Sequence, residues 1–226
     1  MKTIKFTFIV GWIALIGLTA CGFNISNLGA VTRVTGSGKV ATESRNVSGF
    51  NGLIVNGAGK VSIDRTGSES LAITTDDNLL QYIVTEVRGG KLVIEFKPNI
   101  VTDRVADLSF TLTVKDLNSI EINGAAVVDG KNLQADQLSV TVSGAGATKL
   151  AGKADQLTVT LNGAGAHNSE NLESKRATVT NNGAGAATVR VSDSLNANIA
   201  GIGMIEYIGN PQVTKNVAGI GVVRQR

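Results

Sequence analysis

Residues 138–147 have the sequence Leu-Ser-Val-Thr-Val-Ser-Gly-Ala-Gly-Ala, and this stretch returns twice with little change. Residues 157–166 are Leu-Thr-Val-Thr-Leu-Asn-Gly-Ala-Gly-Ala, and residues 177–186 are Ala-Thr-Val-Thr-Asn-Asn-Gly-Ala-Gly-Ala. In each copy, apolar and polar residues alternate up to a glycine-rich turn, and no helical period is present. This alternation predicts a strand with one buried face, so the expected fold class is all-β.

The repeat extends beyond these three copies in both directions. Related turns begin with glycines at positions 124, 144, 163, 183, 201 and 219, so successive turns are 20, 19, 20, 18 and 18 residues apart. A fixed period of this length is typical of a solenoid, and the units lack the regular leucine series of leucine-rich repeats. We therefore expect a β-helix with coils of about 18–20 residues. An antiparallel sandwich with glycine-rich hairpins is the alternative.

On the β-helix interpretation, the residue before each turn glycine belongs to a side-chain ladder at a corner. The predicted structural corner consists of Asn123, Ser143, Asn162 and Asn182, followed by Gly124, Gly144, Gly163 and Gly183. Stacked Asn and Ser side chains can bond to one another and to the turn backbone. The glycines are expected to turn with positive φ and to keep the corner small enough for stacking.

Two residues break the alternation. Asn181 lies in a column that is otherwise apolar, and the pattern offers no explanation beyond an inward extension of the Asn ladder. Lys215 lies in the last, truncated coil, where a charge can cap the open end and block edge-to-edge association.

Residues 1–20 have the features of a bacterial export signal. Lys2 and Lys5 precede an uncharged, mostly apolar run from Phe6 to Leu18. This run is shorter than the about 20 residues that a membrane-spanning helix needs. We therefore expect a cleaved signal peptide rather than a membrane span.

The apolar run ends in Leu-Thr-Ala-Cys at residues 18–21, which resembles a bacterial lipobox. Cys21 is the chain's only cysteine, and we expect it to be lipidated and so to attach the protein to a membrane. A secretory signal with an incidental cysteine, or an uncleaved anchor, is the alternative. Residue 22 is Gly rather than Asp, which by resemblance to the sorting of many Gram-negative lipoproteins favours the outer membrane.

No proline- or serine-rich linker divides the rest of the chain, so we expect a tether over residues 21–34 and one domain over 35–226. Residues 35–116 form an irregular first part of this domain, and residues 117–226 carry the regular repeats. Within the first part, Asp76–Leu80 predicts a short helical turn capped by an Asp side chain.

In the same part, the segments 83–87 and 92–96, separated by Arg-Gly-Gly, predict a hairpin or a tight coil turn.

Composition excludes several classes of function. One histidine and one cysteine cannot build a Cys/His zinc site, a usual haem or iron–sulfur site, or an internal disulfide. Of the 21 basic residues, Lys2 and Lys5 belong to the signal, which leaves 19 against 18 acidic residues and no basic run. Because nucleic-acid binders need a concentrated positive surface, we expect no nucleic-acid partner. We also expect no cofactor, no metal and no enzymatic activity.

Individual polar residues suggest no site either. We expect His167, the lone histidine, to be a solvated loop residue, and Asp76 to be a helix cap rather than a general acid with Asp77. The acidic residues of the repeats do not recur in register, which argues against a calcium ladder. They are Asp129, Asp136, Asp155, Glu170, Glu173 and Asp193.

The chain resembles the head GIN domain family of putative autotransporter adhesin heads over roughly residues 35–222. The resemblance is carried by Arg-Asn-Val-Ser-Gly-Phe-Asn-Gly-Leu-Ile-Val at 45–55, Gly-Lys-Leu-Val-Ile at 90–94 and the repeated Gly-Ala-Gly corners. It implies a right-handed β-helix, and it brings no binding residues with it. We therefore expect a non-enzymatic, lipid-anchored envelope protein that binds a protein, a glycan or itself. A polysaccharide-binding or polysaccharide-active β-helix is the alternative.

Overall fold

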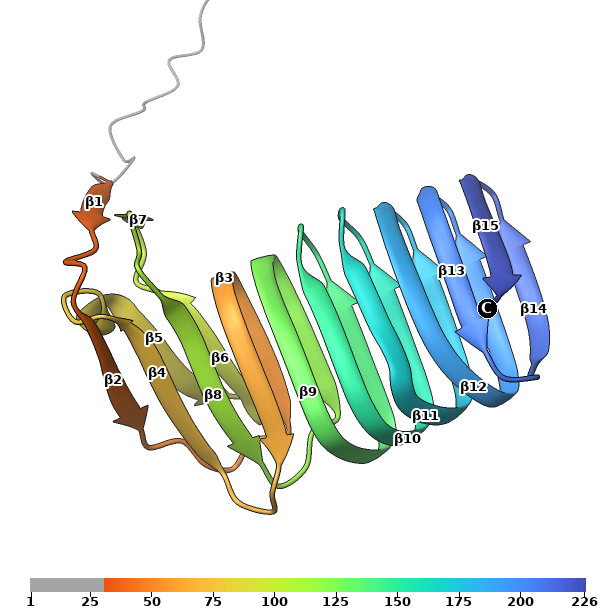
Figure 1. The fold of residues 1–226 in the computed structure, drawn as a ribbon, viewed down its shortest axis with the longest axis horizontal. Helices are drawn as coiled ribbons and strands as arrows, with labels where there is room; N and C mark the ends of the chain where they lie inside the picture. Colours follow the sequence, from red (N-terminus) through yellow and green to blue (C-terminus); the bar gives the residue numbers. More distant parts are fainter. Residues whose placement is uncertain (1–30) are drawn as a thin grey trace, which may run out of the picture. The chain divides into compact units, whose positions relative to one another are not determined.

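A computed structural model describes residues 31–226 of the chain (Figure 1). The predicted signal peptide, Cys21 and residues 22–30 of the predicted tether lie outside the described residues. Within the described range the chain is all-β, as predicted, with one short 3-10 helix.

The first part of the described chain consists of short strands, β3 excepted. They are β1 (Thr32–Thr35), β2 (Val40–Arg45), β3 (Gly52–Arg65), β4 (Ser70–Asp76), β5 (Ile83–Arg88), β6 (Lys91–Phe96), β7 (Ile100–Asp103) and β8 (Leu108–Val114), with the 3-10 helix η2 (Leu80–Tyr82). The repeats form the long strands β9 (Ser119–Val142), β10 (Ala147–Leu161), β11 (Ala166–Asn181) and β12 (Ala184–Ile199). The chain ends with β13 (Ile202–Ile208), β14 (Gln212–Val217) and β15 (Ile220–Gln225).

Thirteen of these strands belong to one large sheet, and β1 pairs separately with β7. From β3 onward, the successive pairs β3–β9–β10–β11–β12–β13–β15 are all parallel (Figure 1). Antiparallel pairing occurs only in the first part of the described chain, between β2 and β4, β4 and β8, and β5 and β6. The last of these pairs confirms the hairpin predicted from Arg-Gly-Gly.

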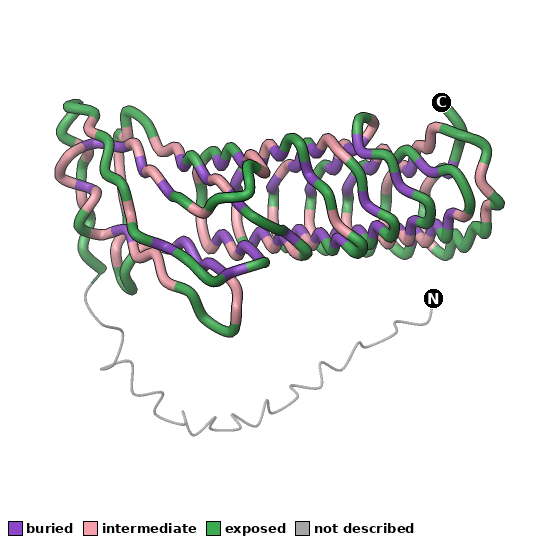
Figure 2. The backbone as a smooth tube through the Cα atoms, turned by 90° about the horizontal axis from the view of Figure 1, so that it is seen from below, coloured by how far each residue is buried: buried purple, intermediate pink, exposed green. Residues whose placement is uncertain are grey.

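The parallel strands place equivalent residues of successive repeats side by side. Val140, Val159, Val179 and Ala197 are paired neighbours, and all four are buried. We call such a set of paired residues a column. Buried and exposed positions alternate along most of the long strands β9 to β12, as the sequence pattern predicts (Figure 2).

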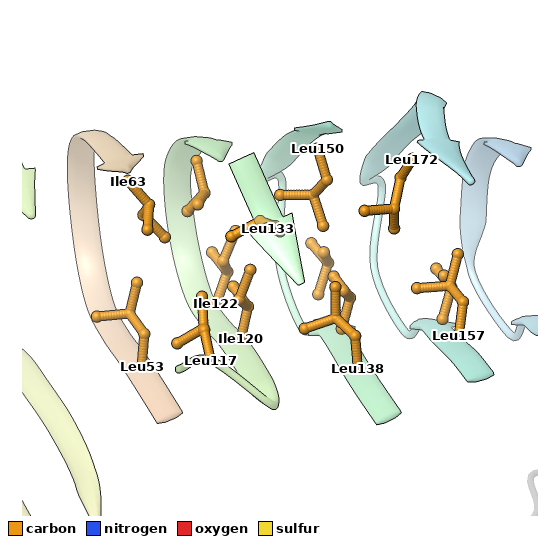
Figure 3. Packing of buried hydrophobic residues seen from close by; sticks show 14 of the residues in the cluster. Leu53, Ile63, Leu117, Ile120, Ile122, Leu133, Leu138, Leu150, Leu157 and Leu172 are labelled. Atoms are coloured by element: carbon orange, nitrogen blue, oxygen red, sulfur yellow. The ribbon is translucent and has the colours of Figure 1, made fainter. Parts of the chain in front are cut away.

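The core is a stack of aliphatic side chains from successive repeats. Leu138 and Leu157 are paired neighbours on β9 and β10, and both are 1 % exposed (Figure 3). Leu53 of β3 lies beside Ile120 of β9 in the same way, so the core continues from the first part into the repeats. Parallel pairing brings like residues together, and a β-branched or leucine column can fill the interior of the repeats without aromatic residues, whereas the buried Phe50 and Phe110 lie in the first part.

The glycine corners are formed for a different reason from the one expected. Of the four predicted corner glycines, Gly124 has a positive φ (156°), whereas Gly144, Gly163 and Gly183 do not, so that part of the prediction is wrong for three of the four. A Cβ atom at any of them would overlap the carbonyl oxygen of the glycine in the preceding repeat. Glycine is required there because two backbones approach closely, and not because the chain turns through the left-handed region.

The predicted Asp cap of a helical turn is also wrong. The residue before η2 is Leu79, and it makes no side-chain capping bond. Asp76 is instead fully buried, and its two carboxylate oxygens accept hydrogen bonds from the backbone amides of Gly38 (2.6 Å) and Ala106 (2.8 Å). The Asp76 carboxylate therefore binds backbone amides of two separate loops instead of capping the helical turn that follows it.

The two exceptions to the alternation are both satisfied by backbone partners. Asn181 is fully buried; its Nδ2 donates to the carbonyl oxygen of Gly185 (2.7 Å), and its Oδ1 accepts from the amide of Gly183 (3.1 Å). It therefore braces the glycine corner from the inside. Lys215 is paired with Ala197 of the apolar column, and its Nζ donates to the carbonyl oxygen of Val223 (2.9 Å), which ties β14 to β15 at the last repeat.

Candidate functional site

An uncharged polar surface covers the outward side of the strand segments that precede the glycine corners. It consists of three neighbouring columns, which we call the polar face. They are Gln137, Gln156, Arg176, Ser194 and Gln212; Ser139, Thr158, Thr178, Asn196 and Thr214; and Thr141, Thr160, Thr180, Asn198 and Asn216. All these residues are exposed or half-buried, and Arg176 is the only charged one among them.

The geometry of the polar face follows from the sheet. Residues in a column are separated by the strand spacing of about 4.8 Å, and neighbouring columns by two residues, or about 6.7 Å. Threonine is favoured here because a β-branched side chain suits a pleated surface. Hydroxyl and amide groups both donate and accept hydrogen bonds, so the face offers a regular array of both kinds of group.

Two shallow hollows lie on this face. One, of about 340 Å³, is bounded by residues of four successive strands, among them Gln156, Thr158 and Arg176. The other, of about 190 Å³, shares Gln156 and Thr158 and extends toward Asn118. Because both hollows are lined by Gln156 and Thr158, they form one continuous depression across the strands.

The predicted corner residues lie along the edge of the polar face, where they are exposed. Asn123 donates to Oδ1 of Asn56 on β3 (3.0 Å), and Asn182 donates to Oδ1 of Asn162 (2.9 Å). Ser143 lies between these two bonded pairs, aligned by a backbone bond from its amide to Ile122 (2.8 Å). The hydrogen bonds between asparagine side chains therefore join neighbouring residues of this column in pairs.

His167 is the clearest disagreement with expectation, because it is 2 % exposed rather than solvated. It points into the core from the inward side of β11, where Gly165 and Ser169 are also buried. Its Nδ1 lies 2.7 Å from Thr148 Oγ1, and its Nε2 lies 3.0 Å from Ser169 Oγ. Because Ser169 donates its own hydrogen to the carbonyl oxygen of Thr188 (3.1 Å), the pattern assigns the ring hydrogen to Nε2.

Burial lowers the pKa of His167 from 6.5 to about 4, so the ring is neutral at physiological pH. A serine hydroxyl bonded to histidine is the arrangement that activates a nucleophile. Here Ser169 is fully buried, and a substrate could not reach it. The group therefore satisfies polar atoms inside the core and is not a catalytic site.

Two ion pairs join neighbouring repeats at residues 151–155 and 170–175, the bends farthest along the strands from the glycine corners, which we call the outer turns. Lys153 lies 3.4 Å from Glu173, and Lys175 lies 3.0 Å from Asp155. Both pairs are well exposed, so each contributes little to stability. Across residues 31–226, no three Asp, Glu, His or Cys side chains come together in a way that would hold a metal ion.

The chain is similar to one described protein family. The model described as "Putative auto-transporter adhesin, head GIN domain" matches residues 49–211, which include the hairpin, most of the polar face and most of the repeats. No curated protein matches the chain.

Solved structures share the fold at low sequence identity. A putative adhesin from Bacteroides fragilis NCTC 9343 matches with a TM-score of 0.71 and 22 % identity, covering 85 % of this chain and 100 % of that one. A putative lipid binding protein from Parabacteroides distasonis ATCC 8503 matches with a TM-score of 0.54 and 23 % identity, covering 86 % and 100 %. A putative adhesin from Parabacteroides merdae ATCC 43184 gives 0.51 and 20 %, covering 86 % and 99 %. At these identities the likeness shows the fold alone.

In the part of the chain that the structure describes, no helix has the length and apolar character to cross a bilayer.

Proposed function

Because the chain belongs to the head GIN domain family of putative auto-transporter adhesins, we propose that it is a non-enzymatic binding protein of the cell envelope. Its anchor is a lipid added to the Cys21 thiol before the signal peptide is removed, and its location is the outer membrane. The lipobox-like residues 18–21 and Gly22 support this anchor and location. Changing Cys21→Ser should release the protein from the membrane fraction, and full retention of the variant would contradict the anchor.

The proposal includes a right-handed β-helix as the scaffold. It is supported by the parallel pairing of β9 to β12 at offsets of 18 to 20 residues, as in Thr158 with Thr178 and Thr178 with Asn196. Parallel strands joined by a crossover are right-handed in about 98 % of cases. An experimental structure with left-handed winding would contradict this part of the proposal.

The polar face is the observation that carries the binding function. It is regular, accessible and nearly uncharged, and two connected hollows run across it. A ligand that matches it needs repeating hydroxyl groups and no strong charge. We therefore propose a neutral polysaccharide as the ligand class, held by many weak hydrogen bonds rather than in one deep pocket.

The test is binding of the lipid-free protein to immobilised neutral polysaccharides, with a β-glucan, a mannan and a galactan as probes and alginate as an acidic contrast. We expect at least one neutral polymer to bind and alginate to bind less. Thr158→Glu places a charge between the two hollows and should reduce binding at least tenfold. The matched control is Thr111→Glu, at an exposed threonine of β8 outside the polar face. Binding of alginate alone, or equal loss in both variants, would contradict the assignment.

A further inference from the structure

A second outward surface lies on the other side of the glycine corners, and it is apolar. Its first column is Ala125, Ala145, Ala164, Ala184, Ile202 and Ile220, and its second is Val127, Ala147, Ala166, Ala186, Met204 and Val222. We call these two columns the apolar face. Ile202, Ile220 and Val222 are 60, 74 and 54 % exposed, which is unusual for a contiguous apolar surface that has no partner.

A third column borders the apolar face and carries charge in an ordered pattern. From β9 to β15 it consists of Asp129, Lys149, Asn168, Thr188, Glu206 and Arg224. The signs along this border column are therefore negative, positive, neutral, neutral, negative and positive. Read in reverse order, every charge meets its opposite and the two neutral residues meet each other.

This antisymmetry has a simple geometric meaning. When two copies pack face to face about a two-fold axis that runs along the strands, each column faces the same column of the other copy with the repeats in reverse order. Asp129 then lies opposite Arg224, and Lys149 lies opposite Glu206. Within one copy Glu206 already bonds Arg224 (2.6 Å), so the contact across the axis would extend an existing ion pair.

The sizes of the apolar side chains follow the same rule. Large residues lie in β13 and β15 and at Val127 in β9, and alanines occupy the remaining positions; Val127 and Val222 are the one pair of large residues that reversal brings together. Reversal of the repeats places Ile202 and Met204 opposite Ala145 and Ala147. It also brings the alanines of β11 against those of β12, at the axis itself. Large against small is the arrangement that lets two surfaces interdigitate.

We propose that this chain forms a two-fold dimer through the apolar face and its border column. Six repeats and three columns give a contact of about 1,000 Å² in total, at the lower limit for a specific interface. The dimer is therefore weak in free solution and is favoured when both copies are held on one membrane. The membrane part rests on the proposed lipid anchor, whereas the interface itself does not depend on polysaccharide binding.

The first test uses cross-linking in the Cys21→Ser background, which has no other thiol. Lys149→Cys protein is mixed with Glu206→Cys protein and treated with a short bis-maleimide. The dimer places these residues opposite each other, whereas two copies of Lys149→Cys keep their thiols three repeats, or about 14 Å, apart along the column. We expect at least tenfold more cross-linked dimer in the mixture than in either variant alone. Equal yields, or none, would overturn the proposal.

The second test measures association by sedimentation equilibrium. Ala166→Glu puts a charge beside the two-fold axis at an exposed position, and it should weaken the dimer at least tenfold; Thr158→Glu, on the polar face, should not. Lys149→Glu should also weaken it, and Lys149→Glu with Glu206→Lys should restore it. Far-UV circular dichroism checks that each variant is folded. Equal effects of Ala166→Glu and Thr158→Glu, or no restoration, would overturn the dimer while leaving polysaccharide binding to be judged separately.

Discussion

The regular repeats and the first part of the described chain hold their turns by different means. In residues 117–226 the turns are joined to the next repeat by backbone bonds, such as those from Ala184 to Gly163 (3.0 Å) and from Ile202 to Gly183 (2.8 Å). In residues 31–116, carboxylates take this role. Asp76 holds two loops, and Glu69 Oε1 accepts from the amides of Gly49 (3.0 Å) and Phe50 (3.2 Å).

The difference shows that a periodic structure supplies hydrogen-bond partners for the backbone groups of its own turns. In a repeat, the neighbour of each turn is an identical turn, so the backbone groups of one find partners in the next. An irregular loop has no such neighbour, and its amides need an acceptor brought from elsewhere in the chain. The first part of the domain should therefore be sensitive to changes in single polar residues, and the repeats to changes in shape.

The largest effect is expected from Asp76→Ala. It would leave the amides of Gly38 and Ala106 without acceptors, and hydrogen bonds to a charged group contribute about 1.5–3 kcal/mol each. We expect a loss of about 3 kcal/mol or more, measured by urea denaturation. Asp77→Ala is the matched control, because the half-buried Asp77 bonds the side chains of Ser37 (2.7 Å) and the exposed Lys39 (3.4 Å) rather than the two loop amides; a loss as large there would contradict the comparison.

Acid should affect the two parts in different pH ranges. The folded-state pKa of His167, about 4, lies below its ordinary value of 6.5, so the unfolded chain takes up the proton first as the pH falls. Stability should therefore decrease between pH 6.5 and 4, by at most about 3 kcal/mol. His167→Gln should remove this slope when the free energy of unfolding is measured against pH.

Glu69 provides the contrast in the first part. Burial raises the pKa of this carboxyl, but the Phe50 amide, Lys115 and the Gly49 amide lower it by more, so that the net shift is downward. The stability from Glu69 is thus complete above pH 4.5 and is lost only below it. Glu69→Gln should leave the slope between pH 6.5 and 4.5 unchanged, and a flattened slope in that variant would contradict the assignment to His167.

The smallest effects should distinguish two kinds of glycine. Gly163→Ala and Gly163→Asn should both cost about 1–3 kcal/mol, because any Cβ meets the backbone of the preceding repeat. Gly67, in the first part, has a φ of 84° and open space around it. Gly67→Ala should cost about 1 kcal/mol and Gly67→Asn less, since asparagine tolerates the left-handed region. Thermal unfolding of the four variants measures this, and a mild Gly163→Asn would refute the steric explanation.

The sequence contains enough to predict the repeats, because both the period and the alternation are local patterns. The burial of His167 can be predicted from the same alternation, because His167 lies on the same, inward side as Gly165 and Ser169. Its position just after a glycine turn favours a loop instead, which is why the prediction is wrong. The burial of Asp76 and its two hydrogen bonds cannot be predicted from the sequence. Its partners Gly38 and Ala106 are 38 and 30 residues away, and both donate through their backbone amides, so no side chain in the sequence indicates the contact.

The repeats differ in length by up to two residues, and the register shows where that difference is absorbed. Across the glycine corner the offset stays at 20, from Leu161 with Asn181 before it to Ser169 with Val189 after it. Across the outer turn it changes, since Glu173 pairs with Arg190 and Arg176 with Ser194. The offset thus falls from 20 to 17 and returns to 18 within the outer turn alone. Residues can therefore be inserted or deleted at the outer turn without moving the buried residues of the strands to the exposed face. The outer turn is also the place to graft a foreign loop, whereas the glycine corner has no room for one, because even a Cβ there overlaps the preceding repeat.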